Sequence, residues 1–219
     1  MFSMLVDKWK KNSLKYWEQS LEHPFVKGIM DGSLSMERFK YYLIQDAHYL
    51  RFFNGMFLAA AELTENDDDR VALVSFAHSL KLGEEDVREF VLDELGITPE
   101  EIDNTPISPN AYHYITHMEL QVATGDVARI YASLLPCTWL YLDVFTTLSS
   151  FSIDVPIFEK FVSAYQADEY EKVLEWQKSL TEKAALASQT PPEELEEIFK
   201  ISSYEEVCFW QMAWDLQKY

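Results

Sequence analysis

Apolar residues recur at spacings of three and four along nearly the whole chain, which is typical of α-helices with one buried face. Glycine, proline and Asn-Asp punctuation divides this pattern into expected helices at residues 4–21, 36–63, 68–95, 110–123, 127–149, 156–165, 169–187 and 193–217. No segment of useful length alternates with a period of two. The sequence therefore predicts an all-α bundle, in which the long connection 96–109 is either a functional loop or a plain crossover.

The second expected helix carries an acidic residue on its apolar stripe. Asp46 lies at helical spacing from the apolar positions Phe39, Leu43, Leu50, Phe53 and Phe57. A carboxylate buried there needs a partner or a ligand, because an unpaired buried charge is strongly unfavourable. Two interpretations stay open: a hydrogen bond to a tyrosine hydroxyl of another helix, or a ligand-facing role in which Tyr49, one turn on, lines the same wall.

One of the two cysteines lies inside the apolar run 127–149. Cys137 directly follows Pro136, and Tyr141 lies one turn further along the same face. Proline within a helix removes a backbone donor and clashes with the carbonyl four residues back, so a kink is expected, at a cost of roughly 3 kcal/mol. A kink that directs the thiol toward a site would offset that cost. The alternative is a buried structural cysteine beside an incidental proline.

The last expected helix contains an acid near its buried face. Glu206 precedes Phe209 and Trp210 by three and four residues, so it shares their side of the helix. Ser203 and Glu206 also have the spacing of a capping box, as does the pair one residue earlier. Glu206 is therefore either part of a helix start or an acid that faces the interior.

Two histidines on one expected helix have a spacing that can hold zinc. His113 and His117 are four residues apart, but no third ligand is identifiable, so hydrogen-bonded or solvent-facing histidines are favoured. The chain lacks the Glu-x-x-His elements of a di-iron bundle, a glycine-rich phosphate loop and a serine nucleophile elbow. We expect neither a metal nor a cofactor.

Composition limits the class of protein. The 219 residues are 48% hydrophobic and 15% aromatic, enough for one large domain covering residues 1–219. The net charge of −19 repels nucleic acid and anionic membranes, and no apolar run approaches the roughly 18 residues of a membrane span. Two cysteines without a recognisable signal peptide favour a reducing, cytoplasmic location.

Five segments in order resemble the thiaminase II (TenA) family. They are residues 23–32 (HPFVKGIMDG), 38–50 (RFKYYLIQDAHYL), 108–118 (SPNAYHYITHM), 134–141 (LLPCTWLY) and 201–210 (ISSYEEVCFW). The resemblance covers nearly the whole chain and implies the haem-oxygenase-like helical bundle, without haem and assembled as a homotetramer. It also implies a thiamin salvage hydrolase. Its substrate would be 4-amino-5-aminomethyl-2-methylpyrimidine, thiamin or both, and its product hydroxymethylpyrimidine.

The resemblance also assigns roles to residues. Cys137 would attack the electron-poor pyrimidine ring, Glu206 would donate a proton to it, and Tyr49 would help to activate the thiol. Asp46 would bind the amino edge of the ring. Three further tyrosines would line the substrate site: Tyr114 as a stacking wall, and Tyr141 and Tyr165 through hydrogen bonds to the substrate or to Glu206.

Two other functions compete with this hydrolase. A haem-binding or haem-degrading protein of the same fold would use His23 as its axial ligand, although this histidine lies at an expected helix boundary. A non-catalytic regulatory or interaction protein would keep the pocket but lack turnover.

Overall fold

The computed structural model describes residues 4–163 and 168–219, apart from the side chains of residues 80–90, 168 and 169. All regular structure within these ranges is helical. The helices are α1 (Leu5–Glu22), α2 (Pro24–Met30), α3 (Met36–Leu63), α4 (Asp67–Leu95), α5 (Pro99–Asn104), α6 (Pro109–Ala123), α7 (Val127–Leu148), α8 (Pro156–Ser163), α9 (Asp168–Ala187) and α10 (Pro192–Asp215). The prediction of an all-α bundle is confirmed.

Two short helices are absent from the sequence prediction. Both α2 and α5 begin with a proline at their first position, preceded by a side chain that caps the helix. The His23 ring accepts from the backbone N–H of Phe25 at 3.1 Å, and the Thr98 hydroxyl accepts from that of Glu101 at 3.1 Å. Neither helix is long enough to show an apolar period. The connection 96–109 therefore contains a helix.

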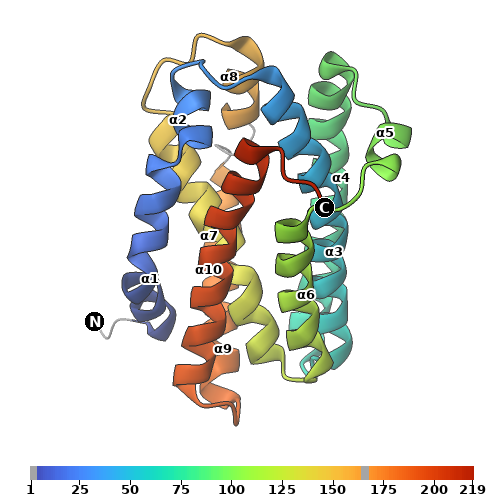
Figure 1. The fold of residues 1–219 in the computed structure, drawn as a ribbon. Coiled ribbons are helices and arrows are strands. Elements are labelled where there is room, and N and C mark those ends of the chain that lie inside the picture. Colours follow the sequence, from blue (N-terminus) through green and yellow to red (C-terminus); the bar gives the residue numbers. More distant parts are fainter. Residues whose placement is uncertain (1–3, 164–167) are drawn as a thin grey trace.

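The long helices run between two ends of the bundle (Figure 1). At one end lie α2, α8 and the start of α3, while the turns before α4, α7 and α10 lie at the other. Helix α7 packs against α10, α9 and α6, and α10 also packs against α1, α3 and α6. Residues far apart in the sequence therefore meet around α7 and α10.

Aromatic rings fill the interior between these helices. The buried indole of Trp210 stacks on three other rings, with centroid distances of 5.5 Å to Phe25, 5.4 Å to Tyr42 and 5.1 Å to Tyr141. Each large buried ring removes much apolar surface from water, and paired rings add further stabilisation. This packing fixes the relative positions of α2, α3, α7 and α10.

A buried amide fixes the segment that leads into α6. The Gln45 side chain on α3 donates to the carbonyl of Pro106 at 3.0 Å and accepts from the backbone N–H of Ser108 at 2.8 Å. Nearby, a ring nitrogen of His48 hydrogen bonds with the carbonyl of Thr105 at 3.0 Å. Because Ser108 is the N-cap of α6, these bonds set the position of that helix against α3.

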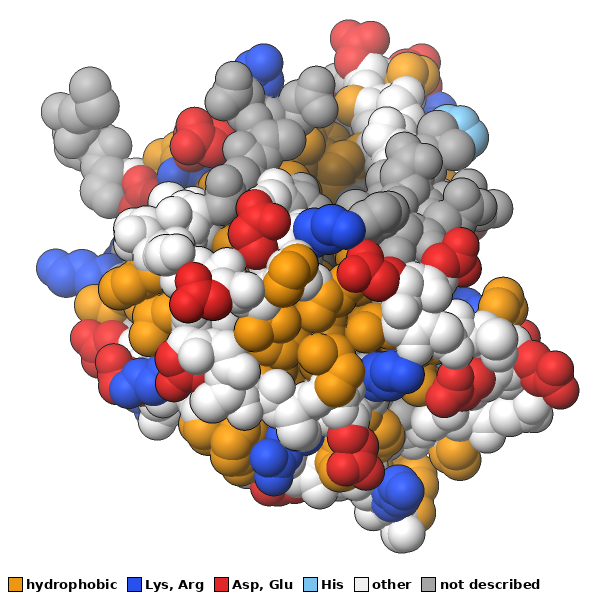
Figure 2. Space-filling model, turned by 90° about the horizontal axis from the view of Figure 1, so that it is seen from above, with side chains coloured by type: hydrophobic (Ala, Val, Ile, Leu, Met, Phe, Trp, Pro, Cys, Tyr) orange, Lys and Arg blue, Asp and Glu red, His pale blue; other side chains and the backbone are white. Residues whose placement is uncertain are grey.

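The surface at the α2 and α8 end carries a hydrophobic patch. Seen from that end, the patch is bordered by acidic and basic side chains (Figure 2). Met36 at the start of α3 and Phe151 in the turn before α8 are both exposed. Within residues 4–163 and 168–219, none of the helices combines the length and apolar character needed to cross a membrane.

Candidate active site

A thiol and a carboxyl meet where α7 packs against α10. Helix α7 continues through Pro136, and the next residue, Cys137, hydrogen bonds with Glu206 of α10. Glu206 is only 2% exposed, whereas Cys137 keeps part of its surface accessible. The cysteine beside the proline therefore faces a buried acid from another helix.

The surroundings of Glu206 hold a proton on it. Burial is the main reason that its pKa rises to about 8, and the charge of Asp46 raises it further. Hydrogen bonds with Tyr114 and Cys137 oppose this rise. The hydroxyl of Tyr114 donates to Oε1 of Glu206 at 2.7 Å. Near neutral pH, Glu206 is therefore mostly a neutral acid that can donate a proton.

The thiol also rests in its neutral form. Burial raises the pKa of Cys137 well above its ordinary value, and the neighbouring Glu206 adds to this shift. Tyr49 acts in the opposite direction on the pKa of Cys137, because a hydroxyl near the sulfur stabilises the thiolate; in this structure that hydroxyl donates to Sδ of Met118 at 3.8 Å. Burial also raises the pKa of Tyr49, so its hydroxyl can donate to sulfur but is not a base. To act as a nucleophile, the thiol would therefore have to lose its proton.

Helix α3 supplies one side of the site. Asp46 lies one turn before Tyr49, is partly accessible, and raises the pKa of Cys137, Glu206 and Tyr141 through its charge. The ring of Tyr49 packs against that of Tyr114 on α6, with a centroid distance of 4.9 Å. A carboxylate and two aromatic rings therefore border the thiol.

The structure brings six of the seven predicted site residues into this region. Tyr141, one turn after Cys137, shares a hydrogen bond of 2.7 Å with the hydroxyl of Tyr42. The seventh, Tyr165, lies outside the described residues.

Sequence reasoning missed one aromatic residue at the site, Phe209. Phe209 packs against Tyr49 and Tyr42, with centroid distances of 5.6 and 5.8 Å. In the sequence Phe209 served only to mark the buried face of the last helix. Its position one turn after Glu206 was the signal that could have placed it in the site.

The capping-box interpretation of the segment before Glu206 is wrong. Ser203 and Glu206 lie in the middle of α10, which begins at Pro192. The hydroxyl of Ser203 donates to the carbonyl of Phe199 at 2.7 Å, within the helix.

The histidines considered as metal or haem ligands have different surroundings. His113 pairs with Glu205 at 2.8 Å, whereas His117 is largely buried and burial lowers its pKa to about 4. No group of three or more His, Cys, Asp or Glu side chains suited to a metal occurs among the described residues. One ring nitrogen of His23 accepts from Phe25, and the other contacts Gln211 at 3.1 Å. Its ring offers no free nitrogen to haem iron.

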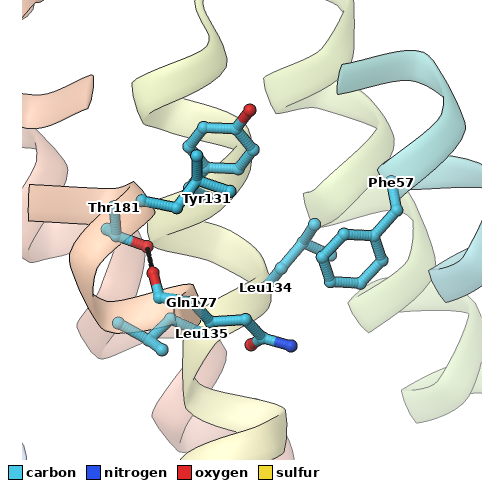
Figure 3. A pocket seen from close by; sticks show the side chains of 7 residues that line it. Phe57, Tyr131, Leu134, Leu135, Gln177 and Thr181 are labelled. Carbon is cyan, nitrogen blue, oxygen red and sulfur yellow. Dashed lines mark hydrogen bonds between the residues drawn. The ribbon is translucent and has the colours of Figure 1, made fainter. Parts of the chain in front are cut away.

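A second feature of the interior is a small cavity of about 10 Å³ between α3, α7 and α9 (Figure 3). It is lined by Phe57, Tyr131, Leu134, Leu135, Gln177, Leu180 and Thr181. None of the six described site residues is among the residues that line it. The Gln177 amide is buried there, and neither of its polar atoms has a hydrogen-bond partner in the described structure. The cavity is therefore distinct from the thiol–acid site.

The fold and this site define a helical-bundle protein in which a buried acid lies beside a thiol. The chain matches the TENA/THI-4/PQQC family over residues 10–216, and it belongs to that family. The aminopyrimidine aminohydrolase of Bacillus subtilis (strain 168) is 35% identical over 201 residues, which cover 91% of this chain and 85% of the relative. With related hydrolases in other bacteria, this match identifies the chain as an enzyme, a hydrolase.

Solved structures confirm the predicted fold. A TenA homologue from P. horikoshii OT3 has a TM-score of 0.88 at 24% identity and covers 97% of this chain and 99% of its own. A domain with a heme oxygenase-like fold from Shewanella denitrificans OS217 has a TM-score of 0.76 at 15% identity, covering 96% of this chain and 92% of its own. The chain is therefore a haem-oxygenase-like helical bundle.

Proposed function

We propose that this enzyme hydrolyses 4-amino-5-aminomethyl-2-methylpyrimidine to hydroxymethylpyrimidine and ammonia, in the salvage of degraded thiamin. The observation that carries the proposal is the contact between the Cys137 thiol and the protonated carboxyl of Glu206. The aminopyrimidine aminohydrolases of B. subtilis and Halalkalibacterium halodurans, 35% and 30% identical to this chain, support the choice of substrate.

The first half-reaction makes use of a proton relay. Glu206 gives its proton to a ring nitrogen as the sulfur of Cys137 bonds to the ring, and the carboxylate takes up the thiol proton. Glu206 then passes that proton to the amine, and the carbon–nitrogen bond breaks to release ammonia. The ring is left as a cation with an exocyclic methylene group. A thiol that is neutral at rest suits this order of proton transfers. Its proton is the one that Glu206 later passes to the departing amine.

The second half-reaction adds water. Water attacks the exocyclic methylene carbon and gives a proton to the Glu206 carboxylate. The carbon–sulfur bond then breaks, the ring nitrogen loses its proton and the thiol is restored. Each step leaves Glu206 ready for the next transfer, so one acid serves both halves of the reaction.

The remaining side chains position the ring in this proposal. Asp46 accepts hydrogen bonds from the amino edge of the pyrimidine. The rings of Tyr114 and Phe209 provide faces for stacking. Tyr49 donates to the sulfur when it carries negative charge. Thiamin has the same pyrimidine half, and its thiazole would leave in place of ammonia.

The proposal is tested by ammonia release from the aminomethyl-pyrimidine with the unsubstituted enzyme and two cysteine variants. Cys137→Ser should abolish turnover while retaining the fold and ligand binding, because a hydroxyl is a far weaker nucleophile than a thiol. Cys208→Ser is the matched control and should stay active. Full activity of Cys137→Ser would exclude Cys137 as the nucleophile.

Lack of turnover by the unsubstituted enzyme would favour a non-catalytic role for the protein. Comparison of kcat/KM with thiamin then ranks the two substrates.

A further inference from the structure

A second buried glutamate directly precedes Glu206. Glu205 is 3% exposed and Glu206 is 2% exposed. Consecutive helix residues point about 100° apart, so the two carboxyls leave α10 in different directions. Glu206 contacts Tyr114, and Glu205 contacts the preceding residue on α6, His113. Two neighbouring contacts thus join α10 to α6. Only the contact between Glu206 and Tyr114 has a part in the proposed reaction.

The pair of Glu205 and His113 is asymmetric with respect to solvent. Nδ1 of His113 lies 2.8 Å from Oε1 of Glu205, but the histidine side chain is 71% exposed. Burial raises the pKa of Glu205, and the histidine lowers it. A cation in water is screened far more than a carboxylate in the interior. The negative end of the pair therefore dominates the electrostatic field inside the bundle.

The groups that face Glu206 from other helices are Asp46 and Tyr49 on α3, Tyr114 on α6, and Cys137 and Tyr141 on α7. Burial raises the pKa of these three tyrosines and of the thiol well above ordinary values, so the four stay neutral. Asp46 is the one carboxylate in this set of described residues. In the proposed complex its charge is offset by the amino edge of the substrate.

We propose that Glu205, held by His113, is a positioning residue whose negative charge keeps Glu206 in its proton-donating form while substrate is bound. This inference rests on the proposed function. Two neighbouring carboxyls resist simultaneous ionisation, so an ionised Glu205 favours a protonated Glu206. Its effect persists in the complex because Glu205 lies outside the contacts proposed for the substrate.

The test is the pH dependence of kcat in a Glu205→Gln variant. Glutamine keeps the shape of glutamate and can still bond with His113, but it has no charge. The alkaline limb of the kcat profile should move to lower pH by about half a unit to one unit, since one neighbouring charge is lost. Just above the limb, kcat should fall about three- to tenfold, whereas kcat and KM at pH 6.5 should match the parent. Glu197→Gln, which removes an exposed charge from the same helix, should leave the limb in place.

A second measurement is independent of turnover and of any change at position 205. In a Cys137→Ser background, the carboxyl carbon of Glu206 is followed by ¹³C NMR across pH 4 to 10. Its signal should show an earlier step as Glu205 ionises, followed by its own titration. Turnover with an unmoved limb in Glu205→Gln, or a single-step titration, would overturn the inference. Absence of turnover in the parent would instead count against the proposed function.

Discussion

The buried amide of Gln177 should make the protein less stable than an apolar side chain of similar size would at the same position. Gln177 is 4% exposed, and both polar atoms of its side chain lack a partner among the described residues. The cavity around it is lined mainly by carbon atoms of Phe57, Leu134, Leu135 and Leu180. A buried polar group without a hydrogen bond costs about 1–3 kcal/mol. Replacing the amide with an apolar group of similar size should remove that cost.

We therefore expect Gln177→Leu to raise the free energy of unfolding by about 1–3 kcal/mol. For a chain of this length, each kcal/mol corresponds to about 2–4 °C, so the melting temperature should rise by about 2–12 °C. Gln177→Ala is the control for shape, because it also removes the amide but enlarges the cavity. It should be less stable than Gln177→Leu by about 2–5 kcal/mol.

The assay is urea unfolding followed by circular dichroism, with thermal melting as a second probe. If Gln177→Leu is less stable than the parent by more than about 1 kcal/mol, the amide makes hydrogen bonds in solution and the reasoning fails. In that case an ordered water in the cavity is the physical explanation, because a bound water satisfies a buried amide.

Three other predictions follow from the site and its supports. Because the pKa of Glu206 is raised to about 8 and the protonated form is proposed to donate, activity should be present below pH 8 and decline as the pH rises through that value, measured as kcat against pH. Gln45→Leu should lower the free energy of unfolding by about 2–4 kcal/mol in denaturant titration, because it leaves the carbonyl of Pro106 and the N–H of Ser108 without partners. Light scattering should give four times the 25.6 kDa chain mass if the expected homotetramer forms; a monomer would contradict that expectation.

The long helices could be read from the sequence because their apolar periods extend over several turns. In α3, the serine cap before Met36 marks the start of the helix, and the end of the apolar stripe marks its last residue, Leu63. The short α2 and α5 depend instead on proline and a capping side chain, and the sequence contains many such local signals that do not form helices. Tertiary contacts decide which of these short segments become helical.

The site was only partly predictable for a similar reason. Asp46 and Glu206 stand out in the sequence because each is an acid on an apolar face. Their nearness to Cys137 depends on how α3, α7 and α10 pack, which no single helix encodes. The contact of Gln45 with residues 106 and 108 is invisible for the same reason, since about 60 residues separate the partners.

The order of these helices along the chain has a consequence for synthesis. Asp46, Tyr114 and Cys137 emerge from the ribosome before Glu206, which belongs to the last helix. Until α10 packs against α7, the thiol lacks both the acid that faces it and the burial that keeps it protonated. The nascent chain therefore passes through a stage in which Cys137 is an ordinary, oxidisable thiol. Completion of the last helix brings the acid to the thiol and buries the thiol in the same event.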